Sequence, residues 1–263
     1  MSLSFIQITD HHLPEAESNL TKGFSPWYAF RAVMRHIAEH HSDVDFIVST
    51  GDLVDQGTDA EYQHFRQKLG LDEISAPPGP QRVSIEGLRD MPMYFLPGNH
   101  DPREPFFRNM FAPSPLRAMN VAFEHSGIQF ICLDWGDQNK AEASVGLFDC
   151  LANTLKSSLP SILWMHHTVV PIGMTRIDSF LPDTVDTFAK CVSGHPIHAI
   201  FCGHTHATYE SEIAGIPVYG LRSTTYSFAE CGDEFLMVLR PPQYRVVTVE
   251  DGMLSTHVVE VAL

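Results

Sequence analysis

Phe201-Cys-Gly-His-Thr-His206 joins an apolar run to two histidines spaced i, i+2, and the prediction of the fold starts from this stretch. The run from Ile197 to Cys202 predicts a short buried strand. Side chains two residues apart in an extended chain point the same way, so His204 and His206 are expected to face one site. Gly203 permits a tight turn where the strand stops. Two imidazoles at a strand end indicate a metal site if other strands bring ligands to the same place.

A strand at the start of the chain ends in a second group of candidate ligands. Residues 4–9 alternate well enough to form a strand, and they precede Asp10-His11-His12. Continued alternation places Asp10 and His12 on one side of the strand and His11 on the other. The candidate ligands of this segment are therefore Asp10 and His12.

A helix separates this strand from the next one. Ser25-Pro26 provides an N-cap residue and a proline at the first helical position, and the residues after it form one apolar face. The following strand, Asp45 to Thr50, is expected to run parallel to the first, as in a βαβ unit. It leads into Gly51-Asp52-Leu-Val-Asp55. Asp52 is the candidate ligand there, and Asp55 is expected to support the site or cap a turn.

Two later strands end in the same way. Met93 to Pro97 precedes Gly98-Asn99-His100-Asp101, where Asn99 offers a neutral oxygen beside several charged groups. Ile162 to Met165 precedes His166-His167, and periodicity alone does not choose between these two histidines. Ligands at the ends of strands converge in α/β proteins, so all five segments are expected to meet.

Together the segments supply seven ligand groups, which is too many for one tetrahedral ion and suits two ions that share a bridging carboxylate. The seven are Asp10, His12, Asp52, Asn99, one of His166 and His167, His204 and His206. None is a cysteine, so a structural thiolate site is not expected. Oxygen and imidazole ligands suit Fe, Mn, Zn or Co without selecting among them.

The composition limits the classes of protein to consider. A chain of 263 residues without a long apolar run predicts one domain over residues 1–263 and no membrane span. The start of the chain has no signal-peptide pattern and the five cysteines form no CxxC pair, so we expect a cytoplasmic protein with reduced thiols. The net charge of −15 disfavours nucleic acid and anionic membranes as partners. Bound metal ions would still attract an anionic substrate.

The five segments resemble, in order, the motifs of the calcineurin-like metallophosphoesterase superfamily. They read Asp10-x-His12, Gly51-Asp52-x-x-Asp55, Gly98-Asn99-His100-Asp101, His166 and Gly203-His204-x-His206. Within that superfamily the chain looks most like the bacterial class III cyclic nucleotide phosphodiesterases and their glycerophosphodiesterase relatives. The resemblance implies a four-layer α/β/β/α sandwich with two mixed sheets, in which the C-terminal strands, about 209–261, complete the second sheet.

The resemblance also implies a role for each matching residue. Asp52 would bridge two ions, one held by Asp10, His12 and His206 and the other by Asn99, His166 and His204. His100 would be the catalytic histidine beside the phosphate, and Asp101 would orient it. Attack by a hydroxide that bridges the two ions would then cleave the ester without a covalent phosphoenzyme.

The resemblance narrows the substrate to a phosphoester. The leading hypothesis is hydrolysis of small phosphodiesters, above all 3′,5′-cyclic nucleotides, and the alternatives are a glycerophosphodiesterase or a broad-specificity phosphomonoesterase. Two departures from the family pattern bear on this choice: Thr168-Val-Val-Pro171 follows the histidine pair, and Arg222 to Tyr226 contains no further histidine. Candidate substrate-binding residues are Arg103, Arg176, Arg222 and Tyr226.

Other roles receive less support from the sequence. A non-catalytic metal-binding scaffold is the remote alternative, and it is disfavoured because all ligand positions and His100 are retained. A nuclease is disfavoured because the chain is acidic and has no basic groove with interleaved aromatics. A homo-oligomer formed through C-terminal strand edges is compatible with the sequence. Residues 71–91, which contain Ala-Pro-Pro-Gly-Pro, predict a loop that is a candidate lid.

Overall fold

A computed structural model describes residues 2–71, 75–77, 79–111, 116–231 and 234–263. The first of its two six-stranded sheets consists, in spatial order, of β14 (Met253–Glu260), β13 (Gln243–Glu250), β1 (Ser2–Ile8), β2 (Phe46–Thr50), β4 (Leu88–Leu96) and β3 (Gln81–Ile85). The second sheet consists of β5 (Val121–His125), β6 (Ile128–Leu133), β7 (Ser161–Met165), β8 (Ile197–Cys202), β10 (Ile216–Gly220) and β9 (Tyr209–Ile213). Two further strands, β11 (Ser227–Cys231) and β12 (Glu234–Val238), form a separate hairpin.

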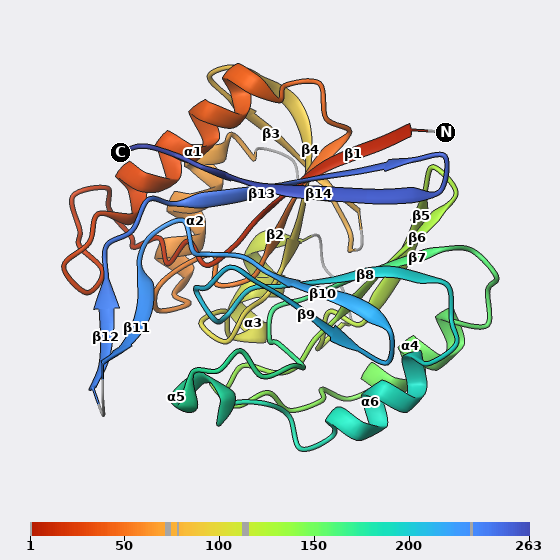
Figure 1. Ribbon diagram of the computed structural model, residues 1–263. Helices are drawn as coiled ribbons and strands as arrows, with labels where there is room; N and C mark the ends of the chain where they lie inside the picture. The colour runs from red at the N-terminus through yellow and green to blue at the C-terminus, as the bar shows by residue number, and fades with distance from the viewer. Residues whose placement is uncertain (1, 72–74, 78, 112–115, 232–233) are drawn as a thin grey trace.

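Helices cover the outer face of each sheet, so the molecule has four layers (Figure 1). The helices are α1 (Pro26–His40), α2 (Asp59–Leu69), α3 (Arg103–Met110), α4 (Leu147–Thr154), α5 (Thr175–Asp178) and α6 (Val185–Val192). Side chains of α1 and α2 belong to the core of the first sheet, and those of α4 and α6 to a second core under the second sheet. The predicted α/β class with two mixed sheets is confirmed.

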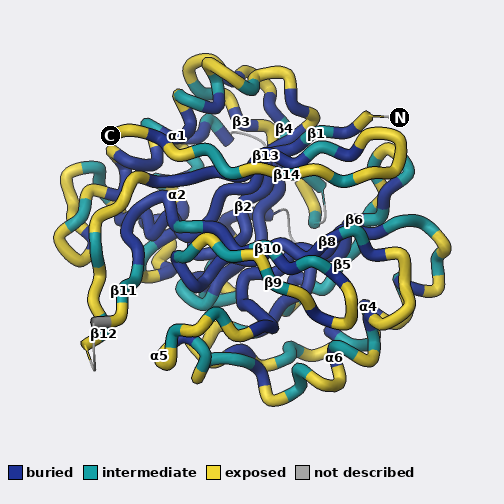
Figure 2. The backbone as a smooth tube through the Cα atoms, in the orientation of Figure 1, coloured by how far each residue is buried: buried dark blue, intermediate teal, exposed yellow. Residues whose placement is uncertain are grey.

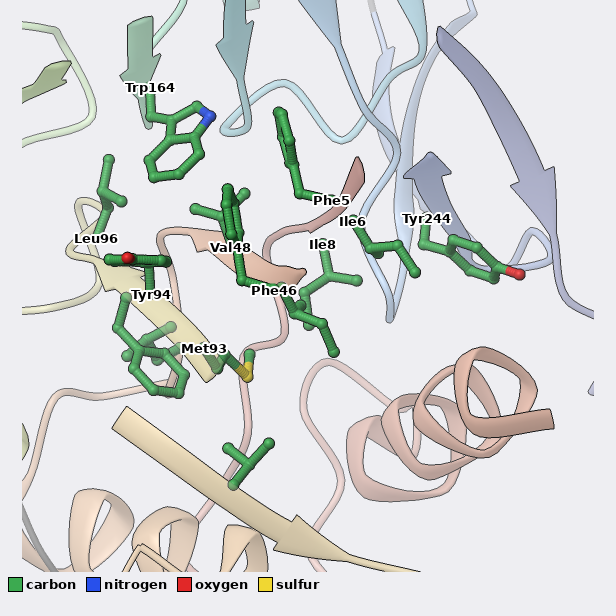
Figure 3. Close-up of a cluster of buried hydrophobic side chains, with 14 of the residues drawn as sticks. Phe5, Ile6, Ile8, Phe46, Val48, Met93, Tyr94, Leu96, Trp164 and Tyr244 are labelled. Atoms are coloured by element: carbon green, nitrogen blue, oxygen red, sulfur yellow. The ribbon is translucent and has the colours of Figure 1, made fainter. Parts of the chain in front are cut away.

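Aromatic side chains fill the space between the two sheets (Figure 3). Phe5 of β1 stacks on Phe46 of β2 with ring centroids 5.1 Å apart. Edge-to-face contacts then join Phe5 to Phe130, Trp164 and Phe201 of the second sheet. These residues are 0–1% exposed, so the two sheets share one continuous core.

Because the strands that precede the motifs are parallel, their C-terminal ends lie at the same edge of each sheet. In the first sheet β1, β2 and β4 are parallel neighbours, and in the second sheet β6, β7 and β8 are. The predicted βαβ unit around α1 is therefore present. Ser25 precedes Pro26 at the start of α1 as predicted, although its side chain makes no capping hydrogen bond. At α2 the predicted capping box forms, because Thr58 and Glu61 bond to each other's backbone N–H groups.

The expectation that the C-terminal strands complete the second sheet is wrong for β13 and β14. Only β9 and β10 join the second sheet, while β13 pairs antiparallel with β1 and β14 pairs with β13. β13 pairs there because β2 hydrogen-bonds to only one edge of β1 and leaves the other edge unpaired. In this position β13 is mostly buried and covers the edge of β1, whereas β14 forms the more exposed outer strand (Figure 2).

Residues 81–85 and 88–91 form strands joined by a tight turn rather than the predicted loop, since β3 and the start of β4 pair at the outer edge of the first sheet. Ile85 and Glu86 face a pocket beside α1 and α2 instead of the predicted metal site. Part of the candidate lid, residues 72–74 and 78, lies outside the described residues. In the parts of the chain that the structure describes, no helix is both long and apolar enough to cross a membrane.

Candidate metal centre

The five motif segments meet where the two sheets come together. Asp10, Asp52 and Asn99 follow the C-terminal ends of three strands of the first sheet, while His166 and His204 follow two strands of the second. The site is therefore built from both sheets rather than from one sheet edge. Backbone hydrogen bonds join the segments directly, for example from Asp10 N to Gly51 O and from Gly203 N to His166 O.

Four of these side chains form a compact group that could hold a metal ion. The ligand-type atoms of Asp10, His12, Asp52 and His206 all lie within 4.8 Å of one another. His206 Nε2 is 3.3 Å from Asp10 Oδ1 and 3.0 Å from His12 Nε2, and His12 Nε2 is 3.6 Å from Asp52 Oδ2. All four residues are buried. Two imidazole nitrogens that face each other beside two carboxylates are a donor set suited to a divalent cation.

Three more candidate ligands lie on the other side of Asp52. His166 Nε2 is 3.4 Å from Asp52 Oδ2 and 3.0 Å from Asn99 Oδ1. The same Asn99 oxygen is 2.8 Å from His204 Nδ1. Asp52 Oδ2 therefore lies between His12 on one side and His166 on the other.

The structure distinguishes the two histidines of the pair that follows β7. His166 Nδ1 donates to Thr50 O at 2.9 Å, which turns Nε2 toward Asp52. His167 Nε2 instead donates to Gln138 O, and burial together with the neighbouring His166 lowers the pKa of His167 to about 3. His11 also points away from the site, since its ring nitrogens bond to Ser49 and Thr224.

Backbone strain is concentrated at the candidate ligands. A positive φ is rare for residues other than glycine, because the Cβ atom crowds the following carbonyl group. Five candidate ligands nevertheless have φ values between 48° and 67°: Asp10, His12, Asp52, His204 and His206. Strand alternation predicted that His204 and His206 face one site, but the structure achieves this with a left-handed backbone after β8 rather than with an extended strand.

The glycines before the ligands allow close approach of neighbouring segments. A Cβ atom on Gly203 would lie 2.1 Å from Thr9 Oγ1, and one on Gly98 would lie 2.1 Å from Asp52 Oδ1. Neither glycine has a positive φ, so they are not needed for a left-handed turn. Gly51 has both features, with a φ of 104° and a Cβ position 2.5 Å from His166 Nδ1.

The buried charges of the site favour a bound cation. Burial raises the pKa of Asp10, but His206 and His166 outweigh it and hold the pKa well below its usual value. Burial lowers the pKa of His166, and the carboxylates of Asp52 and Asp10 reverse this and raise it to about 9. His12 Nδ1 and His204 Nε2 are buried without a hydrogen-bond partner among the described residues. Two ionised carboxylates among imidazoles thus fit a metal ion.

The Asp101 carboxylate makes its hydrogen bonds to groups other than the His100 ring, so a direct role in orienting that ring stays a prediction. The Asp101 carboxylate accepts hydrogen bonds from Leu53 N and Gly98 N and from the Tyr62 hydroxyl, so it holds together the loops after β2 and β4. His100 Nδ1 instead donates to Asp55 O at 2.7 Å. Burial lowers the pKa of His100, but Asp52 and the hydrogen bond to Asp55 O raise it above its usual value.

Two of the three arginines suggested for substrate binding have other roles. The Arg103 guanidinium donates to both oxygens of Asp134 and to three backbone carbonyls, Gly98 O, Asp101 O and Gly136 O. All five of its N–H groups are thus used inside the protein. Arg222 bonds to Pro241 O and Glu260, and it is absent from the described lining of the pocket at the metal centre.

A pocket of about 190 Å³ opens above the candidate ligands. Tyr226, which is 3% exposed, lines it and packs against the rings of His12 and His206. Arg176 of α5 also lines the pocket. Two further features of the lining were not predicted from the sequence. These are Lys22, at a tight turn between β1 and α1, and β11, which forms a hairpin with β12. Lys22-Gly23 was recognisable as a turn from its glycine, whereas residues 227–231 have no clear strand alternation.

Comparison with known proteins agrees with this fold and site. A dimetal phosphatase from Danio rerio superposes with a TM-score of 0.61 at 13% identity and covers 99% of both chains, which shows the shared fold. The family model for calcineurin-like phosphoesterases matches residues 3–208. The chain belongs to this family, and the prediction that it is a hydrolase of phosphoric esters is confirmed at the level of the family.

Two curated relatives resemble the chain over nearly its whole length. A 3′,5′-cyclic-nucleotide phosphodiesterase from Nostoc sp. is 26% identical over 264 residues, which is 98% of this chain and 92% of the relative. The 3′,5′-cyclic adenosine monophosphate phosphodiesterase CpdA of Escherichia coli is 25% identical over 260 residues, with 96% and 88% covered. The resemblance therefore extends beyond the motifs to the C-terminal strands.

Proposed function

We propose that the chain is a dinuclear-metal phosphodiesterase that hydrolyses small phosphodiesters, above all 3′,5′-cyclic nucleotides. The observation that carries this proposal is the position of Asp52 Oδ2, 3.6 Å from His12 Nε2 and 3.4 Å from His166 Nε2. A carboxylate shared by two groups of ligands is what a pair of adjacent ions requires. The names of the Nostoc and Escherichia coli relatives support a cyclic nucleotide as the substrate.

Each ion would have its own ligands in addition to Asp52. Asp10, His12 and His206 would hold one ion, and Asn99, His166 and His204 the other. Bound ions would supply Lewis acidity to a phosphoryl oxygen and would lower the pKa of water toward about 7. The hydrogen bonds from His166 Nδ1 to Thr50 O and from His206 Nδ1 to Tyr226 O fix which ring nitrogen each histidine offers.

His100 would act on the substrate through Nε2. Its Nδ1 donates to a carbonyl oxygen, so Nδ1 keeps its proton and Nε2 is the nitrogen that gains or loses one. The raised pKa of His100 favours the protonated ring. Nε2 can therefore donate a hydrogen bond to the phosphoryl group or a proton to the leaving oxygen. Asp101 would contribute indirectly, by fixing the loop that includes His100.

Relative rates on a diester and a monoester test the proposal. The two substrates are bis(p-nitrophenyl) phosphate and p-nitrophenyl phosphate, at matched concentrations with protein reconstituted with Mn. A large preference for the diester is expected, because the proposed substrate is a diester. A preference for the monoester would contradict the proposal and favour a phosphomonoesterase. If the protein binds two metal ions and hydrolyses neither substrate, the alternative of a non-catalytic metal-binding scaffold is favoured.

Two substitutions separate metal binding from catalysis. Asp52→Ala should lose metal, measured by elemental analysis after desalting, because both proposed sites share this carboxylate. His100→Ala should keep the metal content of the wild type and lose turnover by a factor of about 10²–10⁴. Unchanged turnover of His100→Ala would refute its catalytic role, and full metal content of Asp52→Ala would refute the bridge.

A further inference from the structure

The pocket above the candidate metal centre has an apolar wall on one side. Phe228 of β11 stacks on the His206 ring with centroids 4.4 Å apart, and Phe235 of β12 lies 4.8 Å from Phe228. Met237 adds to the same wall. An apolar surface therefore begins at a candidate metal ligand and continues outward along the hairpin β11–β12.

Arg176 lies at the outer end of this wall. Its guanidinium carbon is 5.2 Å from the centroid of the Phe235 ring, and its side chain lines the same pocket. Arg176 is exposed, and the structure gives its guanidinium no carboxylate partner among the described residues. A cation at this position is available to a ligand, in contrast to the fully bonded Arg103.

The hairpin is fastened to α5 in the position that completes the wall. The Glu230 carboxylate of β11 accepts hydrogen bonds from the backbone N–H groups of Thr175 and Arg176 at 3.0 and 2.9 Å. The hairpin belongs to neither large sheet, and a two-stranded sheet is marginal by itself (Figure 1). The contact with α5 therefore holds Phe235 and Arg176 together, although they come from segments far apart in the sequence.

A phosphate group is charged and does not bind to apolar side chains, so phosphate binding alone does not explain this wall. The metal-ligand cluster, His100, Lys22 and Asn139 line the polar part of the pocket, whereas Phe228, Phe235 and Met237 line its apolar part. An aromatic ring gains stability by stacking on such side chains, and a nearby guanidinium can donate to acceptor atoms on the edge of the ring. Heterocyclic bases combine a π face with acceptor atoms on the edge.

We propose that Phe228, Phe235 and Met237, with Arg176 at their outer end, form a subsite for a heterocyclic base attached to the phosphodiester. The base packs against the wall while its phosphate occupies the metal centre, and Arg176 donates to acceptor atoms of the base. The substrate class is then a nucleoside phosphodiester rather than a glycerol-based one. The inference rests on the proposed function for the reaction, but the binding of the base can be measured separately.

A matched pair of substrates isolates the contribution of the base. One is 3′,5′-cyclic AMP, and the other is methyl ribofuranoside 3′,5′-cyclic phosphate, which has the same cyclic diester and no base. The variants are Phe235→Ala, Arg176→Gln and, as a control on the same strand, Leu236→Ala. Leu236 is 41% exposed and is not among the described residues that line the pocket.

The wild type is expected to favour cyclic AMP in kcat/KM by about tenfold or more. Phe235→Ala and Arg176→Gln should each lower kcat/KM for cyclic AMP by up to about tenfold and change the base-free substrate by less than about twofold. Leu236→Ala should leave both values unchanged. Equal rates of the wild type on the two substrates, or equal losses on both in Phe235→Ala, would overturn the subsite and leave the proposed function standing.

Binding of the products gives a second readout that does not need turnover. Calorimetry would compare AMP with ribose 5-phosphate on the wild type and on Phe235→Ala, after circular dichroism has verified that both are folded. AMP is expected to bind the wild type about tenfold more tightly, and the difference should disappear in the variant. Equal affinities for the wild type would overturn the subsite. Inactivity of the wild type on every diester, together with preferential AMP binding, would refute the proposed reaction but not the subsite.

Discussion

Asp10, His12, Asp52, His204 and His206 hold a backbone conformation that costs roughly 1–2 kcal/mol for each residue with a Cβ atom. Such strain persists only where surrounding contacts enforce it. Here the enforcing contacts run between segments: Leu13 N donates to Leu53 O, and His204 N donates to the Asp10 carboxylate. The cost is thus met by hydrogen bonds between the segments that carry the candidate ligands.

Gly203→Ala is predicted to damage both stability and metal binding. The new methyl group would lie 2.1 Å from Thr9 Oγ1 and 2.8 Å from Asp10 Oδ2, so the strand ends must separate. We expect a loss of roughly 1–3 kcal/mol in the free energy of unfolding and a weaker affinity for Mn. Urea denaturation and metal titration would measure the two effects.

The control is Gly252→Ala in the turn between β13 and β14. Gly252 has a φ of 79°, but no heavy atom lies within 4 Å of its Cβ position. Backbone strain alone should cost about 1 kcal/mol there and leave the affinity for Mn unchanged. Equal affinities of the Gly203→Ala variant and the wild type would show that close approach at Gly203 does not matter for the site.

At the scale of elements, the ion pair of Arg103 and Asp134 joins α3, the Gly98–Asp101 loop and the end of β6. The Asp134 side chain is fully buried and that of Arg103 is 13% exposed. Asp134 also accepts from Met119 N and Gly136 N. Removing one partner leaves the other charge buried and unpaired, which costs more than an exposed pair contributes.

Asp134→Asn is therefore expected to lower the free energy of unfolding by roughly 3–5 kcal/mol. Asp183→Asn is the matched control, since the Lys140–Asp183 pair is 50% and 85% exposed. That change should cost less than about 1 kcal/mol. Urea denaturation of both variants at neutral pH would measure the difference, and a small effect at Asp134 would show that Arg103 finds other compensation.

The same pair predicts a pH dependence of stability. Burial raises the pKa of Asp134, but Arg103 and the backbone N–H groups outweigh it and lower the folded-state pKa below the ordinary 3.8. The contribution of Asp134 is thus present above the unfolded-state pKa and is lost as the pH falls through the folded-state value. Below about pH 5, stability should fall less steeply with falling pH in Asp134→Asn than in the wild type. Parallel slopes would contradict the assignment.

At the scale of the whole molecule, the aromatic core makes the two sheets one cooperative unit. Phe46 contacts Phe5, Tyr94, Phe130 and Trp164, and it is 1% exposed. Phe46→Ala should lower the free energy of unfolding by roughly 3–5 kcal/mol and keep a single transition. Leu239→Ala, at a side chain that is 64% exposed, should change it by less than about 0.5 kcal/mol. Two separate transitions in thermal denaturation would contradict a shared core.

Most of the site followed from local sequence. An apolar run that ends in an oxygen or imidazole candidate ligand, often just after a glycine, recurs five times. Alternation also predicted that Asp10 and His12 face one side and His11 the other, although Asp10 and His12 have a positive φ in the structure. These signals are readable because each depends on a few consecutive residues. The pattern is not sufficient by itself to mark a ligand, since Asp134 also follows a buried strand and its carboxylate binds Arg103.

Sequence patterns alone therefore identified the candidate ligands at the strand ends, the βαβ arrangement and the family, because these depend on residues that are neighbours in the chain. Three features depended on tertiary contacts instead: the pairing of β13 with β1, the internal role of Arg103, and the wall formed by the hairpin β11–β12 and α5. Each joins segments 31 to more than 200 residues apart. Which distant partner a strand edge or a guanidinium meets is decided by the competition among all packing arrangements, and no local pattern encodes its outcome.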